Sequence, residues 1–365
     1  MLCLLLLSVA CTDDTGDLSR ENLREDEAEQ AQANRENFSR LLDAYRTTYT
    51  ARGAHAKTHA CLRAYFDIDS DIAADWRHGV FATPGTRYRT WLRFSNGHFD
   101  LKVSQDYRAD ARGLALKLLQ VTGEPFEVDD VDTQSQDFLL INTPVFFVRT
   151  QQDYNRLVAQ PDDPLAVFFP GFNPASWRLR ELFSVSKTMT SPPASLLDPD
   201  YFSITPYKLG PHNVKYGIKP CKGRAAQDEA PDEDSDADFL QQQLAQELAG
   251  QGACFHFAVQ QQKPELGMRL DDTIQVWSED DSPFIPIATI NIPAQTFSQP
   301  EQVRFCENLS FAPWHALPEH RPIGPLNRLR RHAYAASSQH RHASNATAIP
   351  AALTFWCAAP GFSCE

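Results

Sequence analysis

Several widespread catalytic signatures are missing from this 365-residue chain. It contains no Gly-x-Ser-x-Gly elbow, no P-loop, no strand-linked Gly-x-Gly-x-x-Gly and no His-Glu-x-x-His. These absences argue against the serine hydrolases, nucleotide-binding enzymes and zinc proteases that carry those motifs. The chain also has no Cys-x-x-Cys pair, which argues against a zinc ribbon or a thioredoxin-type redox site.

An excess of positive charge is absent as well. The formal net charge is −13, with 34 Lys and Arg against 47 Asp and Glu. A nucleic-acid partner would require a basic surface stripe, so no such partner is expected. Much of the acidity falls in residues 13–36 and 228–238. Charges of one sign at the density of residues 228–238 indicate a solvated loop.

The apolar run at the start of the chain is too short to span a bilayer. We interpret residues 1–11 as an export signal, because a polar stretch follows directly. Cys11, preceded by Ser-Val-Ala, resembles the cleavage box of bacterial lipoproteins. The expected location is therefore outside the cytoplasm of a bacterium, either periplasmic or attached to a membrane by a lipid on Cys11.

Eight cysteines are compatible with an oxidising compartment. Six of them remain once Cys3 and Cys11 are set aside, and six cysteines allow fifteen pairings. The sequence therefore leaves the connectivity open, although Cys357 and Cys364 are spaced to close a small loop.

The distribution of residue types along the chain predicts one α+β domain. Residues 12–45 form a polar N-terminal helix or linker, residues 46–345 the main body and residues 346–365 a C-terminal tail. Strands are expected where β-branched and aromatic residues cluster between turn signals, at 62–68, 88–94, 114–118, 138–141, 145–148, 214–218, 254–259, 273–277 and 285–292. Helices are expected at 239–249 and 326–342. Many strands ahead of a helical tail favour an antiparallel β-barrel surrounded by helices.

Tyr334 stands between two arginines at helical spacing. Arg330 precedes it by four residues and Arg341 follows it by seven. At roughly 100° per residue, both fall within about 40° of the tyrosine on the helix surface. Nearby cations favour the ionised form of a phenol, and a tyrosinate can hold ferric haem iron. Taken alone, however, this pattern more often marks a basic surface helix.

Four other segments match motifs of a known protein family. In chain order they are Arg52-Gly-Ala-His55-Ala-Lys, Arg93-Phe-Ser95, the Asp-Ala-Arg-Gly-Leu-Ala-Leu-Lys of residues 110–117, and the Asn-Thr-Pro-Val-Phe-Phe-Val-Arg of residues 142–149. With the Arg-Tyr-Arg spacing, the chain resembles the haem catalases, and most closely their short bacterial catalase-like branch. The similarity runs from about residue 50 to residue 345. It implies a catalase-like haem domain at 46–345 that binds haem b and decomposes hydrogen peroxide to water and oxygen.

The resemblance and the chemistry of peroxide cleavage imply the same roles. His55 would take and return a proton, because its pKa is ordinarily near neutrality. Ser95 would fix the tautomer of His55, and Asn142 would hold the peroxide over the iron. Tyr334 would be the proximal iron ligand, kept ionised by Arg330. The remaining cofactor contacts would be arginines that pair with the haem propionates and an aromatic wall residue: Arg52, Arg93, Arg341 and Phe147.

Two departures leave alternatives open. An extra residue in His55-Ala-Lys-Thr-His59 makes His59 a rival for the distal base, although the spacing to Arg52 favours His55. Ala54 stands where typical catalases carry valine, which suggests a roomier pocket. The alternative functions are a peroxidase or isomerase of organic or fatty-acid hydroperoxides, and a haem-binding protein with little turnover. The chain is shorter than the large catalases, so a homo-oligomer is left open and their interwoven tetramer is not assumed.

Overall fold

The structure is a computed structural model that describes residues 17–126, 134–223, 227, 229–362 and 364. In these residues nine strands form one antiparallel sheet in the order β5-β4-β3-β2-β1-β9-β8-β7-β6. The strands are β1 (Thr58–Ile68), β2 (Arg87–Asn96), β3 (Arg112–Leu119), β4 (Ser135–Ile141), β5 (Tyr201–Phe202), β6 (Tyr207–Leu209), β7 (His212–Pro220), β8 (Ala253–Gln261) and β9 (Ile285–Ile292). Because β5 also pairs with β7, eight strands close into a barrel, and β6 extends from β7. The predicted α+β barrel is confirmed.

Every second side chain of each strand points into the barrel, and these side chains fill its interior. Leu62, Ala64 and Phe66 of β1 belong to the main apolar core, which also holds Phe138 of β4 and Phe257 of β8. The rings of the last three lie 4.9–6.3 Å apart. Since successive side chains of a strand point to opposite faces, the residues between them lie outside the barrel. Helix α5 packs on β1, whereas His256 of β8 is exposed.

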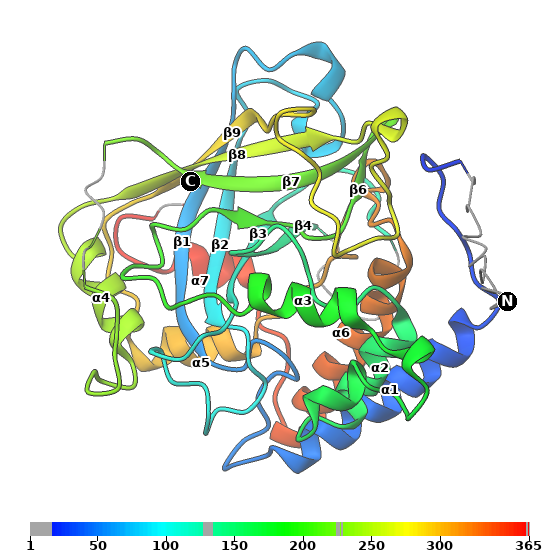
Figure 1. The fold of residues 1–365 in the computed structure, drawn as a ribbon. Coiled ribbons are helices and arrows are strands. Elements are labelled where there is room, and N and C mark those ends of the chain that lie inside the picture. The colour runs from blue at the N-terminus through cyan, green and yellow to red at the C-terminus, as the bar shows by residue number, and fades with distance from the viewer. Residues whose placement is uncertain (1–16, 127–133, 224–226, 228, 363, 365) are drawn as a thin grey trace, which may run out of the picture.

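The described residues include seven α-helices, which in Figure 1 lie below and to the sides of the barrel. They are α1 (Glu27–Ala44), α2 (Gln151–Ala159), α3 (Leu179–Thr188), α4 (Phe239–Leu248), α5 (Pro300–Asn308), α6 (Pro325–Asn345) and α7 (Ala352–Cys357). Single 3-10 turns lie at Ala74–Trp76, Gly79–Phe81, Pro164–Val167, Pro174–Ser176, Pro264–Leu266 and Pro318–His320. Helices α1, α2 and α6 pack on one another beside the barrel, whereas α5 packs against β1.

Two predicted strands are wrong. Residues 145–148 and 273–277 are irregular, yet they lie side by side: the Phe146 N–H donates to the Thr273 carbonyl at 2.9 Å, and the Thr273 hydroxyl donates to the Val148 carbonyl. Val145, Val148, Ile274 and Trp277 are buried there by packing and not by sheet pairing. Strands β5 and β6, of two and three residues, are too short to give a periodic signal.

The C-terminal tail packs against the barrel. Trp356 of α7 and Phe362 lie in a second apolar cluster with Trp91 of β2 and Phe305 of α5. The predicted N-terminal helix is α1, which buries Ala31, Phe38, Leu41 and Leu42.

Three disulfides join Cys61 to Cys306, Cys221 to Cys254 and Cys357 to Cys364. The last closes the small loop expected from the sequence. The predicted export signal, with Cys11, lies outside the described residues. Among the helices that are described, none has the length and apolar character needed to cross a membrane.

Candidate active site

A cavity of about 490 Å³ lies between the outer face of strands β2–β4 and the helices α1, α2 and α6. This volume is typical of sites for small molecules and cofactors. The strands contribute Arg93, Ser95, Gly113, Ala115, Leu139 and Ile141 to its wall, and the helices contribute Phe38, Leu41, Tyr154, Leu157, Arg330 and Tyr334. The wall is therefore mainly apolar, with a few polar groups from different elements.

Strand register sets the order of the side chains on the barrel side of the cavity. Ser95 of β2 pairs with Gly113 of β3, and Gly113 pairs with Ile141 of β4. Residues paired across neighbouring strands share a face, so these three form one row along the cavity wall.

His55 lies over this row, in the segment that leads into β1. Its backbone has φ of 54°, an uncommon conformation for a side-chain-bearing residue, and its N–H donates to the Gly97 carbonyl at 3.1 Å. Its Nδ1 lies 3.1 Å from the Ser95 hydroxyl oxygen. A Cβ on Gly113 would come within 2.5 Å of that Nδ1. The imidazole therefore requires a glycine beneath it.

The surroundings of His55 keep it uncharged. Burial, followed by the positive charges of Arg93 and Arg330, lowers the pKa of His55 to about 3. A neutral imidazole whose Nδ1 is engaged by Ser95 can accept a proton on Nε2.

Tyr334 and Arg330 line the same cavity from helix α6. Arg330 Nη2 donates to the Tyr334 phenol oxygen at 3.2 Å, and Nη1 is held by Asn327 Oδ1 at 3.0 Å and by the Thr205 hydroxyl. Burial alone would lower the pKa of Arg330, but the phenol oxygen of Tyr334 and that of Tyr207 raise it above its ordinary value. The guanidinium is thus a fixed positive charge beside the phenol.

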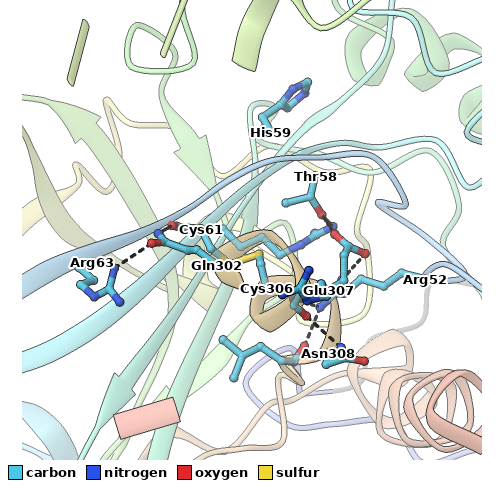
Figure 2. The surroundings of a disulfide bond; sticks show 12 residues. Arg52, Thr58, His59, Cys61, Arg63, Gln302, Cys306, Glu307 and Asn308 are labelled. Carbon is cyan, nitrogen blue, oxygen red and sulfur yellow. Dashed lines mark hydrogen bonds and ion pairs between the residues drawn. A yellow bond between two sulfur atoms is a disulfide. The ribbon is translucent and has the colours of Figure 1, made fainter. Parts of the chain in front are cut away.

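Three further arginines, Arg52, Arg93 and Arg341, line the cavity. Burial would raise the pKa of the Glu307 carboxyl, near the end of α5, but the charges of all three arginines lower it; Figure 2 shows Arg52 beside Glu307. Arg52 forms an ion pair with Glu307 at 3.3 Å, and Arg93 donates to the Thr58 hydroxyl, which in turn donates to Glu307 Oε1. We call Arg52, Arg93 and Arg341 the arginine cluster. Its three guanidinium groups lie close together and can pair with anionic groups.

One predicted residue is not in the cavity. Asn142 directly follows β4, and its side-chain oxygen accepts the Arg112 N–H at 2.7 Å while its amide donates to the Thr190 hydroxyl at 3.0 Å. Among the described residues, Ile141 lines the cavity and Asn142 does not. The chain bends at Asn142 after β4 ends, and the contacts with Arg112 and Thr190 hold its side chain outside the cavity.

The other predicted residues all line the cavity: His55, Ser95, Arg52, Arg93, Phe147, Arg330, Tyr334 and Arg341. His59 is placed elsewhere, fully buried, with Nε2 2.8 Å from Asn96 Oδ1, and it lines a separate cavity of about 230 Å³. Sequence reasoning missed Glu307, for which the sequence gives no signal, because α5 reaches the arginines only through the fold. It also missed Ile141, which strict alternation from Leu139 would have identified.

The comparisons with known proteins point to one fold. No family model matches the chain. A catalase of Ascaris suum is 28% identical over 159 residues, which are 42% of this chain and 22% of that protein. A fungal catalase superposes with a TM-score of 0.60 at 20% identity, covering 82% of this chain and 60% of the other. The chain has the catalase fold.

Two further catalases agree with this fold. Catalase A from Saccharomyces cerevisiae gives a TM-score of 0.59 at 20% identity, covering 80% of this chain and 61% of that one. A bacterial catalase gives 0.56 at 19%, covering 83% and 59%. These structures agree on the fold, and the sequence match is also to a catalase. This catalase-fold chain spans about three fifths of the length of the solved catalases and about a fifth of the Ascaris suum protein.

Proposed function

We propose that this chain is a haem-dependent hydroperoxidase with catalase chemistry, of the short bacterial catalase-like type. The observation that carries the proposal is the convergence of two residue pairs on one cavity. His55 with Ser95 lines it from the barrel side, and Tyr334 with Arg330 lines it from helix α6. The first pair can move a proton, and the second can hold a ferric ion through oxygen.

The residues present fit haem b. The cavity is large and mainly apolar, which suits a porphyrin, and Phe147 lies in its wall. The arginine cluster suits the two propionates, and the buried Nε of Arg93 has no hydrogen-bond partner among the described residues. Tyr334 would ligate the iron, and the missing Cβ of Gly113 leaves space for the His55 imidazole.

When bound, ferric haem would supply the redox chemistry that cleaves the O–O bond. The chain would supply the proton transfer: His55 Nε2 would take a proton from one oxygen of the peroxide and return it to the other as the O–O bond breaks. Ser95 holds Nδ1, so the imidazole keeps one orientation through both transfers. Arg330 would keep its hydrogen bond to the Tyr334 oxygen and so hold the phenol in one orientation.

A second candidate function is turnover of organic or fatty-acid hydroperoxides. The observation that favours it is Ile141, an apolar side chain on the wall beside Ser95 and Gly113, while the Asn142 amide is engaged by Arg112 and Thr190. An alkyl chain would be stabilised by contact with this apolar wall. Hydrogen peroxide would find one hydrogen-bond donor fewer there than if the Asn142 amide faced the cavity.

Steady-state kinetics of the holoprotein test both candidates. A ferric Soret band with rapid oxygen release from hydrogen peroxide would support the leading proposal. Efficient consumption of a fatty-acid hydroperoxide with feeble oxygen release would select the second. A folded chain that takes up no haem would refute both. If His55→Ala changed the spectrum but no rate, the chain would be a haem-binding protein with little turnover.

We also propose that the chain is exported. The three disulfides support this, because structural disulfides persist in oxidising compartments. Cells grown with a labelled fatty acid and then fractionated would test it. Label in the wild-type protein that is lost in Cys11→Ala would support a lipid anchor. An unlabelled protein in the cytoplasmic fraction would refute the proposal. Gel filtration of the holoprotein would establish whether it is a homo-oligomer.

A further inference from the structure

Glu307 approaches the arginine cluster from the side away from the main cavity. The three arginines line the cavity of about 490 Å³, whereas Glu307 and Thr58 line the separate cavity of about 230 Å³. In Figure 2 the carboxylate lies between Thr58 and Arg52. Glu307 therefore leaves the cavity face of the cluster open for a ligand.

The carboxylate is held in its charged form. Burial would raise the pKa of Glu307, but Arg52, Arg93, the Thr58 hydroxyl and Arg341 together hold it below its ordinary value. Its Oε1 accepts from Thr58 at 2.6 Å, and its Oε2 pairs with Arg52.

The arginines are oriented mainly by main-chain carbonyls and not by this carboxylate. Arg52 Nη2 donates to the carbonyls of Cys306 at 2.9 Å and Leu309 at 2.6 Å, and Arg341 Nη1 donates to the main-chain carbonyl of Glu307. Arg93 Nη2 donates to the carbonyl of His55 at 2.6 Å. What the Glu307 side chain adds to these contacts is chiefly its charge.

A disulfide fixes that charge in place. Cys306, next to Glu307, is bonded to Cys61 of β1, and Cys61 is the cross-strand partner of Arg93. The end of α5 is thus covalently tied to the strand pair that carries one of the arginines (Figure 2).

The charges in this group can be counted. Three guanidinium groups, which line the cavity, and one carboxylate behind them give this group a net charge of two positive units (three minus one). We propose that Glu307 is a specificity-determining residue that sets the charge of the arginine cluster to match a ligand with two carboxylates. This inference rests on the proposed function, in which haem supplies those carboxylates as its propionates.

The substitution Glu307→Gln isolates the charge, because a glutamine amide oxygen can still accept from Thr58. Glu301→Gln is a matched control, the same change on the same helix at a side chain that is 68% exposed. Haem loss from each holoprotein would be timed with excess apomyoglobin as acceptor. Binding of the haem dimethyl ester, which has no free carboxylates, would be measured in parallel on the full-length apoproteins.

We expect Glu307→Gln to slow haem loss by about tenfold, the effect of removing one nearby negative charge from an anion site. The same variant should lower the melting temperature of the apoprotein, since the buried arginines lose their counter-charge. Binding of the ester should not change, and Glu301→Gln should match the wild type throughout. Haem loss that is unchanged or faster in Glu307→Gln, with wild-type haem binding intact, would overturn this inference alone. A wild-type chain that binds no haem would overturn it together with the proposed function.

Discussion

Arg330 Nη2 donates a hydrogen bond to the phenol oxygen of Tyr334 at 3.2 Å, from one turn earlier on helix α6. The guanidinium also lies 5.3 Å from the centre of the tyrosine ring. Because both groups line the large cavity, the pair places a phenol oxygen with a guanidinium hydrogen-bonded to it at the cavity wall. This relationship connects the helix to the proposed iron chemistry.

Replacing Arg330 by leucine should weaken haem binding by about tenfold, because it removes the guanidinium that donates to the Tyr334 oxygen, and a hydrogen bond to a charged group contributes about 1.5–3 kcal/mol. The Soret band should shift at the same time. Optical titration with haem measures both effects. Arg331→Leu, at the next and exposed position, is the control and should bind haem as the wild type does. Equal haem affinity in both variants would contradict the role given to Arg330.

The pH dependence of kcat/KM should differ from that of the free energy of unfolding. Burial, with Arg93 and Arg330, lowers the pKa of His55 to about 3, so the base stays neutral from pH 7 to pH 5 and kcat/KM should be flat in this range. An unfolded histidine takes up a proton near pH 6.5. Folding therefore loses stability as pH falls from about 6.5 towards 3, by about 1.4 kcal/mol per pH unit for each such histidine.

Two other buried histidines add to this acid sensitivity. Burial lowers the pKa of His59 to about 4 and that of His320 to about 3. Urea unfolding of the protein at pH 7, 6 and 5 should show the free energy of unfolding falling with pH, while peroxide kinetics on the folded protein stay level. A fall in kcat/KM centred near pH 6.5 in folded protein would contradict the placement of His55.

Gly113→Ala should damage catalysis more than folding. The new Cβ would lie 2.5 Å from His55 Nδ1 and 2.7 Å from the Ser95 oxygen, so the imidazole must move. Overpacking of this kind costs about 1–3 kcal/mol of stability, whereas a displacement of about 1 Å can reduce the rate about a hundredfold. Gly250→Ala, where a Cβ would meet nothing within 4 Å, is the control. Calorimetry and peroxide kinetics on both variants give the comparison; an active Gly113→Ala would show that His55 tolerates displacement.

Removing the Cys61–Cys306 disulfide should affect both stability and the site. Its cysteines are 245 residues apart, against 33 for Cys221 and Cys254, so the loop-entropy model assigns it about 2 kcal/mol more stabilisation. The double alanine variant at Cys61 and Cys306 should also lose haem faster, because α5 carries carbonyls that orient Arg52 and Arg341. The Cys221 and Cys254 pair is the matched control. Haem loss that is equal in the two double variants would show that the bridge is structural only.

Much of this arrangement could be predicted from the sequence. The clusters of β-branched and aromatic residues around Leu62, Leu92 and Leu114 and the helical spacing of Arg330 and Tyr334 are local signals, and the strands and helix α6 are present in the fold. The arginine-flanked Tyr334 depends only on spacing along one helix, so its geometry was also predictable.

Contacts between distant elements were not predictable. The approach of Glu307 to Arg52 joins residues 255 positions apart, and no local pattern encodes it. The orientation of Asn142 depends on where β4 ends and on the register with Arg112. Motif similarity identified the residue type there, but the bend after β4 and the contacts of Asn142 decide which of two neighbouring side chains enters the cavity.

Ile141→Asn should change the preferred peroxide. An amide at this position would project from the wall row that Ile141 shares with Gly113 and Ser95 and could donate to a bound peroxide. Oxygen release from hydrogen peroxide should rise by about tenfold, the value of one added hydrogen bond of about 1.5 kcal/mol, and turnover of a fatty-acid hydroperoxide should fall. Asn142→Ala is the control: it removes the bonds to Arg112 and Thr190, so it should lower the melting temperature and leave the ratio of the two rates unchanged. If Asn142→Ala changed the ratio of the two turnover rates and Ile141→Asn did not, Asn142 would be the residue that holds the peroxide.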